Sequence, residues 1–130
     1  MTVISRLTPE DYEKARAFIK RIKPLLATND VIIAINHPKN KEFDRKYNMR
    51  HAEKIKVLKS LTADDCTKID FNNNPNYPSA ELYFFLKDTE IVSYGEKEQI
   101  SLYIKMYIDG RDRYDKTIVI SFHEDGVYDY

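Results

Sequence analysis

Two segments near the C-terminal end alternate apolar and polar residues at every step, which is the pattern of β-strands with one buried face. In residues 100–108 the even-numbered positions are all apolar. In residues 117–124 the apolar side is predicted to be Ile118, Ile120 and Phe122. Between the segments, residues 109–113 are rich in glycine, aspartate and arginine and are expected to form the turn of an antiparallel hairpin.

This hairpin determines which polar side chains can act together. Successive side chains point to opposite faces of a strand, so burying both apolar rows leaves Tyr103, Lys105 and His123 on the other face. A phenol, an amine and an imidazole on one sheet surface can bind a phosphodiester and move protons on it. The pattern therefore bears on function as well as on fold.

The N-terminal half is predicted to be mainly helical. A helix begins after the hydroxyl of Thr8, with a proline and two acids in its first turn, and its apolar stripe ends near residue 26. A short strand is expected at residues 31–35. Residues 39–47 are polar and charged and are predicted to be a loop, after which Asn48 could cap a second helix.

The C-terminal half is predicted to form the sheet. A capped turn at residues 60–65 leads into strands at residues 66–71 and 80–87, which are separated by an asparagine- and proline-rich loop at residues 72–78. Residues 88–98 are predicted to be a polar connection to the hairpin.

This order predicts an α+β fold in which two N-terminal helices pack on one face of a mainly antiparallel, twisted sheet. At 130 residues, we expect a single domain over residues 1–130. No apolar run approaches the roughly 20 residues that span a bilayer. The N-terminus lacks the apolar core of a signal peptide, and the single Cys66 fits a reducing compartment, so we expect the cytoplasm.

The net charge of zero conceals a split along the chain. Residues 1–60 carry 14 Lys and Arg against 7 Asp and Glu, and residues 61–130 carry 7 against 14. The basic half is either a surface for a nucleic-acid backbone or the solvated side of amphipathic helices.

Three histidines without ligand spacing give no zinc signature, and three glycines form no phosphate loop.

Several short motifs occur in an order that is typical of one family. They are the capped turn at residues 60–65, Lys68, and the segments at residues 81–85, 102–105 and 120–123. In this respect the chain resembles the MqsR-type toxins, which are ribosome-independent mRNA interferases with a RelE-like fold, encoded together with an antitoxin. The resemblance covers about residues 48–130.

The resemblance implies a metal-independent endoribonuclease that cleaves single-stranded RNA without a cofactor and has a cognate antitoxin as partner. In this reaction a ribose 2′-hydroxyl attacks the adjacent phosphate, which requires a base, an acid and cations. Position by position, the family's motifs give Lys68, Tyr103, Lys105 and His123 as catalytic candidates. The lysines would hold the phosphate, Tyr103 would donate a proton or hydrogen bond, and His123, with an ordinary pKa of about 6.5, would exchange the proton.

The chain departs from the family pattern on its middle strand, where Phe84 or Phe85 stands at the position of a glutamine. No cleavage sequence is therefore predicted. The chain is also neutral where these toxins tend to be basic.

Other interpretations of the same residues stay open. Tyrosine and lysine are common on exposed strand faces, and His123 could be a solvent-facing histidine near a chain end. One alternative is a non-catalytic RelE-like module that binds protein or RNA, and another is a regulatory subunit whose acidic half docks on a basic partner. His37 and His51 are predicted to have no special role.

Overall fold

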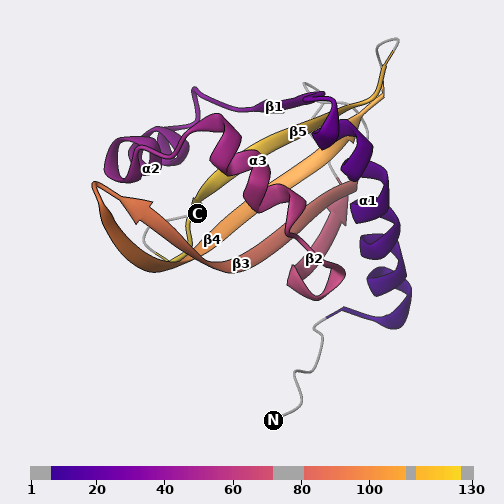
Figure 1. Ribbon diagram of the computed structural model, residues 1–130. Coiled ribbons are helices and arrows are strands. Elements are labelled where there is room, and N and C mark those ends of the chain that lie inside the picture. The colour runs from indigo at the N-terminus through magenta and orange to yellow at the C-terminus, as the bar shows by residue number, and fades with distance from the viewer. Residues whose placement is uncertain (1–6, 72–80, 111–113, 127–130) are drawn as a thin grey trace.

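The computed structural model describes residues 7–71, 81–110 and 114–126. In these residues the chain forms three α-helices, a short 3₁₀ helix and a five-stranded mixed sheet, which confirms the α+β class (Figure 1). The elements in chain order are α1 (Pro9–Ala27), β1 (Val31–Ile33), α2 (Pro38–Tyr47), α3 (His51–Lys59), η1 (Ala63–Asp65), β2 (Cys66–Phe71), β3 (Glu81–Ser93), β4 (Glu96–Asp109) and β5 (Lys116–Glu124).

The strand order across the sheet is β1-β5-β4-β3-β2. β1 runs parallel to β5, and the other neighbouring strands are antiparallel. Figure 1 shows α1 and α3 in front of the sheet, with β1 and β5 along its upper edge. The sheet thus has one face covered by helices and one outer face.

The helices and the covered face of the sheet share one core. Its fully buried large apolar side chains come from all three helices and from the three central strands: Ile22, Phe43, Leu58, Phe85, Leu102, Ile104, Met106, Val119 and Phe122. Burying one such side chain stabilises the fold by roughly 1.5–3 kcal/mol. This core therefore fixes which strand residues must point away from the helices.

The start of α1 confirms the sequence prediction. The hydroxyl of Thr8 accepts a hydrogen bond from the backbone N–H of Asp11 at 3.1 Å, and Pro9 occupies the first helical position. The predicted apolar stripe is the buried side of the helix, where the ring of Phe18 stacks on Tyr83 with centroids 3.9 Å apart.

The predicted loop at residues 39–47 is wrong, because these residues form α2. His37 caps this helix with its side chain, Pro38 is the first helical residue, and Phe43 and Tyr47 lie one turn apart on the buried side. Asn48 does not begin the next helix; it ends α2 in the left-handed conformation with φ of 51°. The buried side of this helix has only two apolar residues, Phe43 and Tyr47, so the charged residues around them hid the helical pattern in the sequence.

The predicted polar connection at residues 88–98 is also wrong. β3 continues to Ser93 and β4 starts at Glu96, joined by Tyr94 and Gly95, which both have positive φ as a tight hairpin turn requires. Ile91 and Ile100 belong to the core, so this polar hairpin is anchored on one side. The predicted loop at residues 72–78 lies outside the described residues.

The C-terminal strands pair as predicted, with one difference at a β-bulge. Tyr103 is opposite His123, and the register shifts between Lys105 and Met106. An extra residue at a bulge reverses the alternation on one side of it. Val119 and Phe122 therefore face the core, whereas Ile118 and Ile120 pack on the outer face, contrary to the prediction.

Among the described residues, no helix combines the length and the apolar character needed to cross a bilayer.

Candidate functional site

The outer face of the sheet holds a second, smaller apolar cluster. Its buried members are Leu82, Phe84 and Tyr107, and Tyr103, Ile118 and Ile120 pack against it. This cluster forms the floor on which the predicted site residues lie. The outer face is thus less polar than the sequence suggested.

A row of side chains crosses four strands at one register level. Lys68 of β2 is the register partner of Phe84 on β3, which is the partner of Lys105 on β4. Lys105 in turn is opposite Ser121 of β5, whose side chain is buried. Because cross-strand partners share a face, the fold brings the two predicted phosphate-binding lysines to the same ring.

Both ammonium groups lie over Phe84. The Nζ atom of Lys68 is 4.4 Å from the ring centroid, and that of Lys105 is 5.3 Å from it. Both distances are within the range of cation–π attraction. Phe84 therefore holds two cations within about 10 Å of each other.

The surroundings lower the pKa of the Lys105 ammonium. Partial burial is the main cause, and the positive charge of Lys68 adds to it, while Asp70 acts in the opposite sense. Lys68 itself is 3.9 Å from Asp70 on an exposed part of β2. An ammonium destabilised by burial and by a like charge gains more from a bound anion than a fully solvated one does.

The next register row joins Leu86, Tyr103 and His123. The Tyr103 ring stacks on the His123 ring with centroids 5.2 Å apart and an interplanar angle of 24°. Burial raises the pKa of the Tyr103 phenol, and the charge of Asp125 adds to the effect. Tyr103 therefore keeps its proton at neutral pH and can act as a donor.

His123 differs from expectation because it is fully buried, with 0% of its surface exposed. Its Nδ1 lies 3.2 Å from the carbonyl oxygen of Glu124, and because a carbonyl only accepts, Nδ1 carries the proton and Nε2 the lone pair. Burial lowers the pKa of this imidazole, so it is neutral at pH 7. His123 has the protonation state of a general base but is covered.

His37 is a neighbour of the site that the sequence did not single out. Its ring centroid is 5.9 Å from that of His123, and its Nδ1 accepts a hydrogen bond from the backbone N–H of Lys39 at 3.2 Å. Histidine followed by proline at a helix start was the available signal, but residues 39–47 were predicted to be a loop. His51 instead lies 3.0 Å from the side-chain oxygen of Asn29, through its Nε2 atom.

Two further chemistries find no support among the described residues. No group of three or more His, Cys, Asp or Glu side chains there could hold a metal ion. Cys66 is buried, and this burial raises the pKa of its thiol to about 11. At neutral pH it is a thiol rather than a nucleophilic thiolate.

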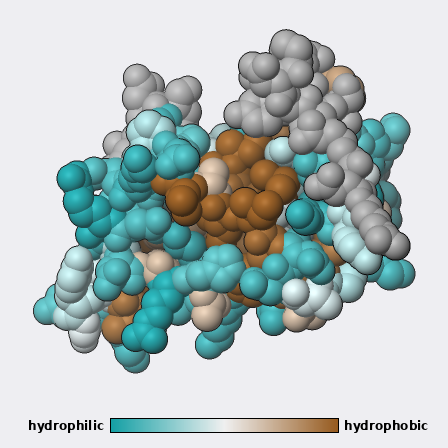
Figure 2. Space-filling view, turned by 90° about the horizontal axis from the view of Figure 1, so that it is seen from above, coloured by the Kyte–Doolittle hydropathy of each residue, from teal (hydrophilic) through white to brown (hydrophobic). Residues whose placement is uncertain are grey.

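The edge of the sheet beside the site is apolar. Figure 2 looks down on the side where Figure 1 places β1 and β5, and apolar side chains gather near its centre. Ile32 and Ile35 are 51% and 73% exposed, and Ile32 is the register partner of Ile118.

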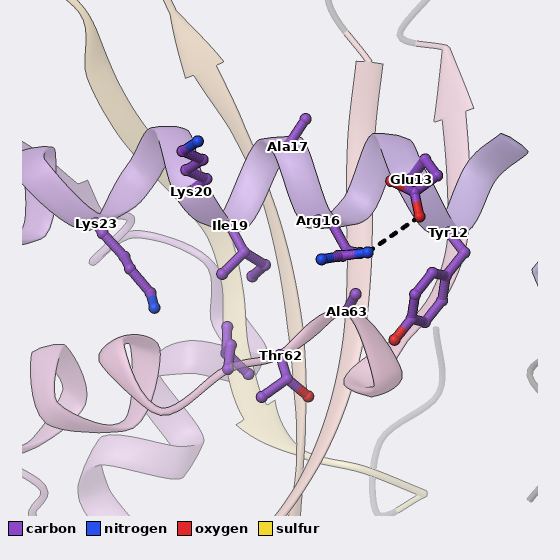
Figure 3. Close-up of a pocket in the computed structure, with 10 residues that line it drawn as sticks. Tyr12, Glu13, Arg16, Ala17, Ile19, Lys20, Lys23, Thr62 and Ala63 are labelled. Atoms are coloured by element: carbon purple, nitrogen blue, oxygen red, sulfur yellow. Dashed lines mark hydrogen bonds and ion pairs between the residues drawn. The ribbon is translucent and has the colours of Figure 1, made fainter.

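A separate groove lies in the helical layer (Figure 3). Its volume is about 550 Å³, and it runs between α1 and residues 61–63. Arg16, Lys20 and Lys23 line it, and Arg16 forms an ion pair with Glu13 at 3.2 Å. None of the four predicted catalytic residues lines this groove.

Comparison of the chain with family models, with curated proteins and with solved structures gave no match.

Proposed function

We propose that this protein is an endoribonuclease of the mRNA-interferase class, the toxin of a toxin–antitoxin pair, with an MqsR-type sequence and a RelE-like fold. One observation carries the proposal: Lys68, Lys105 and Tyr103 surround Phe84 on one sheet face, with His123 stacked against Tyr103. The two lysines supply the positive charge that a phosphodiester needs.

In the proposed reaction a ribose 2′-hydroxyl loses its proton and attacks the adjacent phosphorus, and the bond to the 5′-oxygen breaks. Lys68 and Lys105 hold the non-bridging oxygens, where negative charge increases in the transition state. The protonated phenol of Tyr103 donates to the phosphate or to the departing 5′-oxygen. The products are a 2′,3′-cyclic phosphate and a 5′-hydroxyl.

The lone pair on Nε2 of His123 is the base in this scheme. Because the imidazole is covered in the structure, bound RNA must expose it, and the stacked ring of Tyr103 is the neighbour that has to shift. The role of His123 thus depends on a movement at the Tyr103 ring.

The burial of His123 favours a second candidate, a non-catalytic RelE-like module that binds RNA or protein through the same face. Phe84 and the two lysines suffice for binding, because stacking and charge attract single-stranded RNA without any acid or base.

In the enzyme proposal the protein acts in the cytoplasm, and a cognate antitoxin neutralises it.

The test is incubation of the purified protein with single-stranded RNA in EDTA, followed by end-group analysis. We expect discrete fragments ending in 2′,3′-cyclic phosphate, and Tyr103→Phe should slow their formation roughly 10²–10⁴-fold. Tyr94→Phe is the matched control, because Tyr94 is 77% exposed at the β3–β4 turn. This variant should cleave RNA at the rate of the wild type.

RNA binding by the wild type without cleavage would support the non-catalytic module. If the protein neither binds nor cleaves RNA, both the enzyme proposal and the RNA-binding module are contradicted.

A further inference from the structure

We propose that His37 contacts the phosphate of bound RNA in this same site, through the N–H group of its Nε2 atom. The inference rests on the proposed function for the identity of the ligand. It adds a residue that the motif resemblance does not contain and that helical capping alone would not require.

The fold fixes His37 beside the site through a buried amide. The Nδ2 of Asn40 donates to the carbonyl oxygens of Ala34 and Ile120 at 2.9 and 3.0 Å, and its Oδ1 accepts from the backbone N–H of Phe122 at 2.8 Å. Two of these bonds attach the first turn of α2 to β5 directly before His123, and the third attaches it to the residue after β1. His37, the cap of that turn, is therefore held at a fixed position.

The capping bond determines which nitrogen of His37 carries the proton. Nδ1 accepts from the backbone N–H of Lys39, so in the neutral ring the proton is on Nε2. In His123 the arrangement is the reverse, because Nδ1 donates to the Glu124 carbonyl and Nε2 keeps the lone pair. The two neighbouring rings thus have opposite tautomers: His37 offers a donor and His123 an acceptor.

The charges around His37 keep it in the donating neutral form. Burial is the main cause that lowers the pKa of His37, and the ammonium groups of Lys39 on its own helix and of Lys105 on β4 lower this pKa further. The third facing group, on β5, is the neutral imidazole of His123. Protonation would place a hydrogen on Nδ1 and break the capping bond, which also opposes it.

Exposure assigns different tasks to the two rings. His37 is half-buried and His123 is fully buried. Of the two rings, His37 is therefore the one with surface exposed to an incoming phosphate. Together with Lys105, which is close enough to lower the pKa of His37, the Nε2–H of His37 supplies a neutral hydrogen-bond donor beside a cation.

The first test separates capping from phosphate contact by two substitutions. Serine is as good a helix cap as any residue, whereas alanine is a poor one. His37→Ser should keep the melting temperature of the wild type yet slow RNA cleavage roughly 10²-fold, as loss of one transition-state donor does. His37→Ala should lower the melting temperature as well. Wild-type cleavage by His37→Ser would overturn the inference.

The second test does not depend on cleavage. Imidazole resonances are followed by ¹⁵N NMR during titration with a 2′-O-methyl RNA dinucleotide, which cannot be cleaved. The Nε2 resonance of His37 should shift and its pKa should rise, because a nearby anion favours the charged ring. His51, which contacts Asn29 away from the cluster, is the internal control and should not respond.

The outcomes distinguish this inference from the proposed function. A wild type that cleaves RNA while the His37 resonance does not move contradicts the phosphate contact only. A wild type that does not cleave RNA while His37 responds contradicts the enzyme proposal and supports the contact.

Discussion

The outer face of the sheet and the groove beside α1 both present cations, but they hold them in different ways. On the outer face, Lys68 and Lys105 lie over the ring of Phe84, and partial burial lowers the pKa of Lys105. In the groove, Lys20 and Lys23 are exposed on the surface of α1. The two regions are on opposite sides of the sheet.

This difference favours the outer face over the groove as the proposed anion site. Exposed lysines are fully hydrated and mobile, and exposed ion pairs contribute only about 0–1 kcal/mol. Lys105, which lies over a ring and is partly stripped of water, attracts an anion more strongly, because less reorganisation accompanies binding. The comparison predicts that function follows the rigid outer face rather than the groove.

The largest expected effect comes from removing one lysine in each region. Lys105→Ala should slow RNA cleavage roughly 10²–10³-fold, because a donor to the transition state is lost. Lys20→Ala removes a cation of the groove and should leave the rate unchanged. Single-turnover cleavage assays in EDTA measure both, and equal losses would break the comparison.

The next effect is on stability and compares one polar contact from each region. Asn40→Ala leaves the buried Phe122 N–H and two carbonyl groups without their partner, so the free energy of unfolding should fall by about 3 kcal/mol. Tyr12→Phe removes the 3.0 Å hydrogen bond to Asp64 at the exposed groove and should lower the free energy of unfolding far less. Urea denaturation of both variants gives the comparison, and similar losses would contradict it.

A smaller effect is expected on the pH dependence of stability. Burial lowers the pKa of both His37 and His123 below the ordinary 6.5. As the pH falls through 6.5, the unfolded chain takes up protons that the folded protein does not, so stability is highest above this pH and falls below it. Urea midpoints between pH 7.5 and pH 5 should fall, and less steeply for His37→Ser. A flat profile would show that these rings are not held neutral.

The smallest effect concerns the ring under the two ammonium groups. Phe84→Leu keeps an apolar side chain but removes cation–π contacts of about 0.5–1 kcal/mol each, so RNA affinity should fall about threefold to tenfold. Phe71→Leu is the matched control, because Phe71 is exposed at the end of β2. Fluorescence anisotropy with labelled 2′-O-methyl RNA compares them, and an unchanged affinity for Phe84→Leu would assign the ring a packing role only.

The pairing that builds the site could be predicted because its signal is local and regular. Alternation over residues 100–108 and 117–124 predicts that Tyr103 and His123 share a face, and the structure makes them register partners. The prediction assigned Ile118 and Ile120 to the wrong face, because the bulge between Lys105 and Met106 reverses the alternation and leaves no mark in the apolar pattern. The face of His123 was predicted correctly, because His123 lies beyond the bulge.

What the sequence concealed depends on contacts between distant segments. Asn40 is a polar residue in a charged stretch, yet it is buried because Ala34, Ile120 and Phe122 satisfy its amide. No periodicity predicts a buried amide, so α2 was missed, and with it the position of His37. The burial of His123 has the same origin, since it depends on rings from other elements.

The most direct test of the central claim is to map where RNA binds. Backbone amide shifts of the protein are recorded by NMR during titration with single-stranded 2′-O-methyl RNA. We predict that the largest shifts lie at Lys68, Phe84, Tyr103 and Lys105, with little change along α1. Shifts confined to α1 and residues 61–63 would contradict the claim that the outer face of the sheet is the functional site.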